Sequence, residues 1–554
     1  MAFFCRIPHA IRGGRELTRW LPWVAAALIF IAALSTASRL PLFDPDEGYY
    51  PATAAESVDH GRWWDLRFNG EPRWEKPILA YGLIQGSFAA FGRSVASARL
   101  PSAIEGAALV LLVGLLLGKL VSPRAGAMTA LVLATTLGVQ TFARAAHPEI
   151  ALVLSIAVTE LLLTMWLVVP RAERIRGWAG WTGLSLGYGL LAKGPVAVVV
   201  PLIAVACAAP FVMDLRARWR EGLIDAAMAG LVALVVAAPW YIAMTSTHGA
   251  EFLRVAVWMQ NVGRFAGQMA DHGQSAGVFA LAAAVGLLPW IGLLPAALAR
   301  LRKPSTNRRE AVRFTLAVTV GSSLLFYSLS ASKLASYSLA LIPSASALIG
   351  LLLDDILDDV RGNAAVAFRW AGGVLALVAT ALIAVALFNG TLFRTRDLIG
   401  GVPAAATSET VWWLVGPMLI VFACAALALF VLSNRGRIAT LAIAGTLAPL
   451  AALLAAAPLL DDAYPWQRFG NQIARDPAPA SIQMYRAPSL TFFARQPIQI
   501  VSEDELRDLL RQPGSGWVVL GADWADKPDL SARLAASGAR IVDRSTRLIL
   551  VKLR

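Results

Sequence analysis

Apolar runs of roughly 20 residues recur along almost the whole chain, and no other feature restricts its fold as much. A helix needs about 20 apolar residues to cross a bilayer, and within lipid it satisfies its own backbone hydrogen bonds. Of the 554 residues, 57% are hydrophobic and only 15% are charged. The sequence therefore predicts an α-helical polytopic membrane protein.

Thirteen of these runs are expected to span the bilayer. They lie at 20–38, 98–118, 124–142, 149–169, 177–192, 194–213, 222–244, 276–299, 312–330, 334–353, 366–388, 411–432 and 437–458. Another apolar stretch, 77–92, is short and interrupted by two glycines. We expect that stretch to lie at the membrane surface, so that it does not count as a span.

The distribution of Arg and Lys sets the orientation of these spans. Cytoplasmic loops collect Lys and Arg, and with thirteen spans the strongly basic loops, such as 300–309, fall on the side of the N-terminus. Counting 77–92 as a span would invert every later loop. The sequence thus predicts a cytoplasmic N-terminus with an uncleaved anchor, and it places 39–97 and 460–554 on the outer side. Loop cations also account for the net charge of +13 without a nucleic acid partner.

The chain is expected to form two domains, a transmembrane domain at 1–459 and a small α/β domain at 460–554. In the second, β-like runs (SIQMY, IQIVS, GWVVLGA, RLILVKL) alternate with helical stretches (EDELRDLLR, DLSARLAAS). Neither GxGxxG nor GxxxxGK[ST] occurs, which argues against an ATP-driven transporter. Three scattered cysteines predict neither a disulfide framework nor a metal cluster.

Polar chemistry is concentrated in the first outer loop, in residues 43–77 (FDPDEGYYPATAAESVDHGRWWDLRFNGEPRWEKP). The start of this segment predicts a helix with Asp44 as its N-cap and a proline in its first turn. A carboxylate, two phenols and a hydroxyl then share one helix face: Asp46, Tyr49, Tyr50 and Thr53. An alternative is that Asp46 and Glu47 only complement the helix dipole.

Further polar clusters are expected on the same outer side. They comprise Trp74-Glu75-Lys76-Pro77, Arg144 with His147 and Glu149, then Trp258, Gln260, Asn261, Arg264, Phe265 and His272, and finally Ser332-Lys333 with Ser336-Tyr337. Lys and Arg beside tyrosine donors suit a lipid-linked phosphate. The alternative for any single cation is snorkelling to the membrane surface, but several clusters on one side favour a phosphate site.

Three blocks carry a resemblance to a known family: DEGYYPATAAESVDHGRWWDLRFNGEPRWEKPILAYGL at 46–83, FGRSVASARLPSA at 91–103 and SKLASYSLALIP at 332–343. They closely resemble the bacterial lipid A 4-amino-4-deoxy-L-arabinose transferases, which belong to the protein O-mannosyltransferase-like family of the GT-C superfamily. The resemblance covers essentially the whole chain. It implies a GT-C fold of about 13 transmembrane helices with a periplasmic α/β domain.

The same resemblance implies an activity. A sugar would pass from undecaprenyl phosphate to lipid A, or to another envelope glycan, at the periplasmic face of the bacterial inner membrane. The sequence requires no cofactor for this reaction, and it leaves open whether a divalent metal binds.

The resemblance also implies roles for single residues. Asp46 stands where the family keeps its catalytic acid, and Glu149 replaces a second acid that is Asp in the family. Positions around the carrier phosphate and its approach are matched by Tyr50, Lys76, Arg264, Lys333 and Tyr337. We expect supporting roles for Glu47, Tyr49, Arg73, Glu75 and Asn261.

Two further departures from the family pattern leave the sugar and the acceptor open. Arg73 replaces an aromatic residue, and Gln260-Asn261 replaces a Glu-His pair. The donor sugar is therefore either aminoarabinose or a hexose, hexosamine or uronic acid, and the acceptor either lipid A or another glycan or protein.

We expect a single inverting displacement, helped mainly by cations that stabilise charge on the departing phosphate. A hydroxyl acceptor would need Asp46 or Glu149 as general base, whereas an ionised phosphate acceptor would not. Glu149 has an alternative reading as an interfacial cap. A transporter is disfavoured because the spans are nearly free of acids in their middles. A flippase or lipid-binding protein without chemistry remains an alternative.

Overall fold

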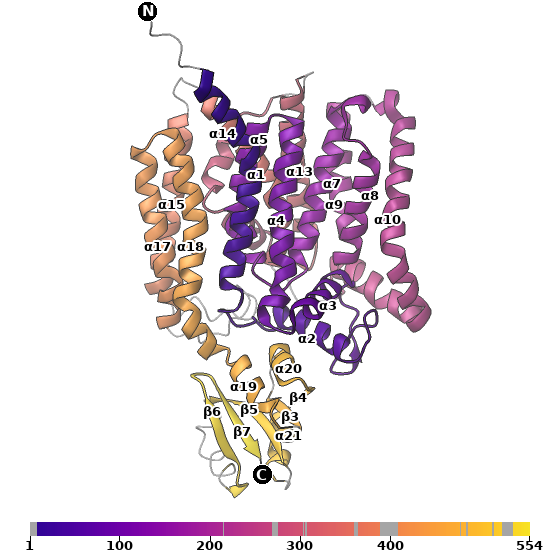
Figure 1. The fold of residues 1–554 in the computed structure, drawn as a ribbon, viewed down its shortest axis with the longest axis vertical. Coiled ribbons are helices and arrows are strands. Elements are labelled where there is room, and N and C mark those ends of the chain that lie inside the picture. Colours follow the sequence, from indigo (N-terminus) through magenta and orange to yellow (C-terminus); the bar gives the residue numbers. More distant parts are fainter. Residues whose placement is uncertain are drawn as a thin grey trace, which may run out of the picture.

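A bundle of long helices carries a small sheet-containing domain at one of its ends (Figure 1). The computed structural model describes residues 8–553 except 214, 269–274, 303, 305–306, 359–363, 388–407, 477, 484–485, 512–514, 523–533 and 535. The first helix begins at the bundle end opposite the C-terminal domain (Figure 1).

The helices of the bundle confirm a protein that crosses the membrane many times. Among the described residues, nine helices are long and apolar enough to span, or ten if a pair bent by 101° counts as one. The nine are α1 (Pro8–Ala37), α4 (Val95–Leu120), α7 (Glu149–Val168), α10 (Leu215–Phe252) continued by the π-helix η2 (Leu253–Gly263), α13 (Arg308–Leu329), the 3-10 turn η5 (Ala335–Leu341) with α14 (Ile342–Asp358), α15 (Ala364–Leu387), α17 (Ser408–Val431) and α18 (Asn434–Ala463).

Shorter helices lie in the remaining predicted spans. They are α5 (Pro123–Ala134) with α6 (Leu137–Phe142), α8 (Trp178–Lys193), α9 (Val196–Val212) and the bent pair α11 (Ala276–Gly286) with η4 (Ile291–Leu293) and α12 (Leu294–Leu298). A short 3-10 turn, η1 (Arg171–Glu173), precedes α8. The count of thirteen spans stays a prediction, because several of these helices are shorter than a bilayer requires. The predicted loop at 389–410 lies largely outside the described residues.

The first outer loop folds into α2 (Asp46–Asp59), the strands β1 (Arg67–Phe68) and β2 (Glu71–Pro72), and α3 (Leu79–Phe91). Both helices lie at the end of the bundle that faces the C-terminal domain (Figure 1). With 13 residues, α3 is only about 20 Å long, too short for a hydrocarbon core of about 30 Å. Its length and position agree with the expected surface segment.

The prediction that Asp44 caps α2 is wrong. Pro45 precedes the helix, and no side chain caps it. The Asp44 carboxylate is instead buried and accepts hydrogen bonds from the backbone N–H (3.0 Å) and the hydroxyl (2.6 Å) of Ser489. The local sequence predicted that this carboxylate caps α2, but it binds Ser489, which lies 445 residues away in the sequence.

The C-terminal domain confirms the expected small α/β region. Its sheet has the strand order β4-β3-β5-β7-β6, in which β3 pairs in parallel with β4 and β5, while β7 runs antiparallel to β5 and β6. The elements are α19 (Trp466–Ile473), β3 (Ala480–Gln483), α20 (Pro488–Ala494), β4 (Ile498–Val501), α21 (Glu503–Leu509), β5 (Gly516–Gly521), β6 (Arg540–Arg544) and β7 (Leu548–Leu553). Leu40, which follows α1, packs into the same apolar cluster as Tyr464 and Trp466, so the domain is docked on the bundle.

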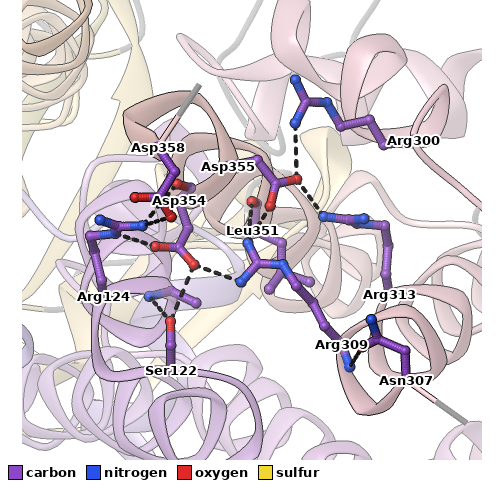
Figure 2. Close-up of polar contacts among 11 residues, drawn as sticks. Ser122, Arg124, Arg300, Asn307, Arg309, Arg313, Leu351, Asp354, Asp355 and Asp358 are labelled. Atoms are coloured by element: carbon purple, nitrogen blue, oxygen red, sulfur yellow. Dashed lines mark hydrogen bonds and ion pairs between the residues drawn. The ribbon is translucent and has the colours of Figure 1, made fainter. Parts of the chain in front are cut away.

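At the opposite end of the bundle, charged side chains tie α14 to its neighbours (Figure 2). The Arg309–Asp354 and Arg313–Asp355 pairs measure 2.7 and 2.6 Å, and Arg124 pairs with Asp354 as well. These contacts join α5, α13 and α14. The other end of α14 continues back into η5, which carries Tyr337, so this network anchors a helix that leads to the candidate site.

Candidate active site

A buried ion pair between Glu47 and Arg99 fixes α2 to α4. The two carboxylate oxygens lie 2.7 and 2.8 Å from Nε and Nη2 of Arg99. Arg99 also donates to the backbone carbonyls of Ala37 and Leu40, both at 2.9 Å, while Glu47 accepts from the N–H of Ala146 at 2.9 Å. Two helices and two loops are thereby locked together at the start of α2. The sequence predicted a supporting role for Glu47 but missed Arg99, although it lies in the FGRSVASARLPSA block.

Asp46, directly beside this buried pair, is exposed. Its charge acts on Tyr50 and on His147, whose rings are 5.2 Å apart. Burial raises the pKa of the Tyr50 phenol and lowers the pKa of His147. Both groups are therefore neutral near pH 7, and Asp46 is left as the accessible acid of this group.

Glu149 lies buried at the start of α7, beside the end of α8. It forms an ion pair with Lys193 and accepts a hydrogen bond of 3.0 Å from the Ser336 hydroxyl. The Lys193 ammonium lies 4.4 Å from the centre of the Tyr337 ring. The structure thus brings the predicted residues Glu149 and Tyr337 together through Lys193, to which the sequence assigned no role in the site.

Lys76 joins this group from the first loop. Its ammonium donates to the Glu75 carbonyl at 3.1 Å. Burial lowers its pKa to about 7, and repulsion by Lys193 and Arg264 contributes to the shift, while Glu149 and Glu75 oppose it. Lys193 and Arg264, from two other segments distant in sequence, therefore lie close enough to Lys76 to repel its positive charge.

Two buried polar atoms in this group lack a hydrogen-bond partner within the part of the chain that the structure describes: Oε2 of Glu75 and Nε of Arg264. Buried polar groups in folded proteins are nearly always paired. The Arg264 N–H and the clustered ammonium groups are donors that suit a phosphate, because charge-assisted hydrogen bonds to phosphate are strong. We therefore describe Lys76, Lys193, Arg264 and Glu149 as the candidate anion site.

Arg73 and Tyr49 support the loop behind the anion site. The Arg73 guanidinium carbon lies 3.8 Å from the centre of the Tyr49 ring. The same group pairs with Glu75 at 3.3 Å and donates to the Tyr81 hydroxyl at 3.3 Å. Arg73 thus orients Glu75, whose backbone carbonyl accepts from Lys76.

Asn261 and Lys333 are less closely connected to the anion site. The Asn261 amide donates to the backbone carbonyls of Ala256 and Val257 at 3.1 and 3.0 Å, within η2. The Lys333 side chain is half-buried and makes no hydrogen bond or ion pair with any residue that the structure describes. It is not among the charges that most affect Lys76. His272 lies outside the described residues. In the described ranges, no three His, Cys, Asp or Glu side chains gather to hold a metal ion.

The low pKa of Lys76 predicts a pH-dependent affinity for a lipid-linked phosphate. Lys76 loses its positive charge as the pH rises through about 7, and an anion binds the charged form better. In Lys76→Arg the charge persists at every accessible pH. Between pH 7 and 9 we expect the wild-type affinity to fall relative to Lys76→Arg by up to about tenfold per pH unit. Binding isotherms of both proteins at several pH values measure this difference, and parallel profiles would contradict the assignment.

A many-helix membrane bundle that gathers cations and acids at one surface fits a membrane enzyme that acts on a lipid-linked phosphate. A family model described as dolichyl-phosphate-mannose-protein mannosyltransferase matches residues 75–242. The chain is similar in sequence to undecaprenyl phosphate-aminoarabinose arabinosyl transferases and similar in fold to ArnT, as follows.

An undecaprenyl phosphate-alpha-4-amino-4-deoxy-L-arabinose arabinosyl transferase from Pseudomonas aeruginosa is 32% identical over 378 residues, which make up 67% of this chain and 66% of that protein. The protein of the same description from Aeromonas salmonicida is 28% identical over 419 residues, 72% of each chain. The crystal structure of ArnT from Cupriavidus metallidurans bound to undecaprenyl phosphate has a TM-score of 0.77 at 21% identity, covering 96% of this chain and 97% of that one. This likeness shows that the fold is shared over both the bundle and the C-terminal domain.

Proposed function

We propose that the protein transfers 4-amino-4-deoxy-L-arabinose, or a related sugar, from undecaprenyl phosphate to lipid A at the periplasmic face of the inner membrane. The observation that carries the proposal is the convergence of Lys76, Lys193 and Arg264 on one anion site. His147 links this site to the exposed Asp46, because the charges of Asp46, Lys76 and Lys193 all act on its ring. The names of the relatives, which include undecaprenyl phosphate and aminoarabinose, support this choice of donor and sugar.

The anion site acts on the leaving group. The acceptor oxygen forms a bond to the anomeric carbon of the sugar while the bond from that carbon to the phosphate oxygen breaks, and the electron pair stays on the phosphate. Lys76, Lys193 and Arg264 stabilise the charge that develops there, since preorganised electrostatics is commonly the largest catalytic term. A single displacement of this kind inverts the configuration at the anomeric carbon.

The two acids have different tasks in this mechanism. Asp46 is accessible, so it orients the acceptor and stabilises positive charge on the sugar ring; with a hydroxyl acceptor it would also remove the proton. Glu149 is buried and paired with Lys193 and Ser336. We therefore assign Glu149 to positioning Lys193, whereas the sequence suggested catalysis.

The orientation of the chain follows from the same proposal. The arginines around Asp354 (Figure 2) include Arg124 of α5, a helix that lies at the end of the bundle where α1 begins (Figure 1). Arginines are expected at a cytoplasmic surface. We infer that the transmembrane domain at 1–459 has a cytoplasmic N-terminus and that residues 460–554 form a periplasmic domain.

A reporter fused after Leu459 tests this orientation. Alkaline phosphatase, which is active only in the periplasm, is expected to be active at this position, and green fluorescent protein is expected to be dark. A fusion in the loop that precedes α13 serves as the control and should give the opposite pattern. Cytoplasmic activity at Leu459 would contradict the orientation and the count of thirteen spans.

Purified protein tests the activity itself. Incubation with undecaprenyl phosphate-linked aminoarabinose and lipid A is expected to give lipid A heavier by one aminoarabinose residue. A second candidate donor carries a hexose, hexosamine or uronic acid. It is favoured by Gln260, whose amide oxygen is buried without a hydrogen-bond partner in the described residues and which replaces a family acid. Product from that donor alone would replace the sugar in the proposal, and no product from either donor would favour a flippase or lipid-binding protein.

A further inference from the structure

A separate polar cavity of about 350 Å³ lies between the bundle and the C-terminal domain. Its walls come from the end of α1, the start of α4, and the helices α19 and α20. The polar side chains that line it are Ser38, Arg93, Ser94, Gln467, Asn471 and Arg495. None of these residues belongs to the candidate anion site around Lys76.

Two cations, Arg93 and Arg495, line this cavity. Nη1 of Arg93 lies 3.2 Å from the Asp59 carboxylate, and its guanidinium carbon lies 4.6 Å from the centre of the Phe492 ring. Nη2 of Arg93 donates to the Phe492 carbonyl. Burial lowers the pKa of Arg93 to about 10, and the charge of Arg495 contributes to the shift. Asp59 is half-exposed, at 55%, so this single carboxylate only partly compensates two cations.

The backbone of Arg495 adds an independent observation. Arg495 has φ 55° and ψ 25° and follows the end of α20. This left-handed conformation favours Gly or Asn over a long side chain. Non-glycine residues held in such conformations are concentrated at functional and ligand-binding sites. Arg495 therefore lines the cavity although its left-handed backbone conformation would suit a smaller residue better.

The cavity opens at the level of the membrane surface, because α1 ends at Ala37 and α4 begins at Val95. On α1, Leu28, Ile31 and Leu34 are exposed at 55%, 62% and 36%. These three residues are spaced by three and share one helix face, and Ser38, which lines the cavity, directly follows the end of α1. An apolar, lipid-facing stripe therefore leads directly to the polar cavity, as an amphipathic ligand with acyl chains would require.

We propose that this cavity binds the phosphate headgroup of a membrane lipid whose acyl chains lie along α1. Guanidinium groups with hydroxyl and amide donors match the geometry and charge of a phosphate. The headgroup belongs either to the acceptor lipid of the proposed transfer or to an anionic phospholipid of the same leaflet. Both sources share this chemistry, and the experiment separates them.

Native mass spectrometry of the full-length purified protein tests the proposal. The protein is exposed, without any sugar donor, to micelles that contain phosphatidylglycerol, phosphatidylethanolamine or lipid A at equal concentrations, and the retained lipid is counted. Wild-type protein is expected to retain lipid A or phosphatidylglycerol in preference to phosphatidylethanolamine. In Arg495→Asn this retention is expected to fall by about tenfold, the effect of losing one charge-assisted contact.

The variants are chosen so that folding does not decide the result. Asn accepts the left-handed backbone of Arg495, whereas Arg93→Gln also removes the contacts to Asp59 and Phe492. The control Arg511→Gln removes an exposed cation of the same domain, which is paired with Asp508 at 3.3 Å, and it should leave retention unchanged.

The lipid whose retention falls in Arg495→Asn identifies the ligand of the cavity. Loss of lipid A retention alone identifies the acceptor as the ligand, and loss of phosphatidylglycerol as well identifies an anionic phospholipid site. Equal retention by wild type and Arg495→Asn, or an equal loss in Arg511→Gln, would overturn the proposal. Because no donor is present, the result is independent of whether the proposed transfer occurs.

Discussion

Asp46→Asn is expected to lower the transfer rate by about 10²–10⁴-fold, the usual contribution of a positioned acid or base. The side chain is exposed at the start of α2, so its charge supports the fold only through the helix dipole, worth about 0.3–1 kcal/mol. Activity and stability should therefore separate. Turnover of lipid A and the thermal unfolding of the purified variant measure the two effects.

Glu71→Gln is the matched control for this prediction, because Glu71 is an exposed acid of the same loop. It should behave as wild type in both assays. Full activity of Asp46→Asn would show that Asp46 only complements the helix dipole, and equal losses in both variants would point to the general charge of the loop.

Glu47→Gln, one residue away, is expected to act on stability. The carboxylate is buried against Arg99, and removing one partner of a buried ion pair costs about 3–5 kcal/mol, since the other charge stays behind without compensation. We expect a marked fall in the unfolding temperature in detergent. In Glu47→Gln/Arg99→Met no uncompensated charge remains, so its loss should be smaller than the sum of the single losses. Unfolding of Glu47→Gln at the wild-type temperature would contradict the role given to this pair.

The different roles of Asp46 and Glu47 could not be predicted from the sequence. Both acids lie in the first turn of α2, and the dipole favours either equally. Only the packing of α2 on α4 buries one of them against Arg99, which lies 52 positions later. Asp44 is similar: its partner Ser489 belongs to another domain, so no local pattern could predict that contact.

The fold class could be predicted because lipid leaves few alternatives to apolar helices. The small C-terminal α/β region was also readable, from alternating strand-like and helical runs. The number of spans was harder to predict, since α8 and α9 have only 16 and 17 residues. Helices of that length are apolar enough to be predicted as spans, but they are shorter than the roughly 20 residues that crossing a bilayer requires.

Four residues at the anion site were expected from the family resemblance: Lys76, Arg264, Glu149 and Tyr337. In the structure, Glu149 and Tyr337 contact Lys193, and Lys193 and Arg264 lie near Lys76. Lys193 was missed because a single cation at the end of an apolar run looks like a snorkelling side chain. Lys333 was expected at the anion site because it precedes the hydroxyl donors Ser336 and Tyr337 in the sequence, but it is not among the charges that most affect Lys76. Which helix ends adjoin is decided by packing between segments far apart in sequence.

The sugar transfer proposed for this protein depends on Asp46. Its most direct test is mass spectrometry of lipid A from cells that lack the protein and carry either the wild-type chain, Asp46→Asn or Glu71→Gln. We predict lipid A heavier by one aminoarabinose residue with the wild type and Glu71→Gln, and unmodified lipid A with Asp46→Asn and with the empty vector. Identical lipid A in all four strains, or full modification with Asp46→Asn, would contradict it.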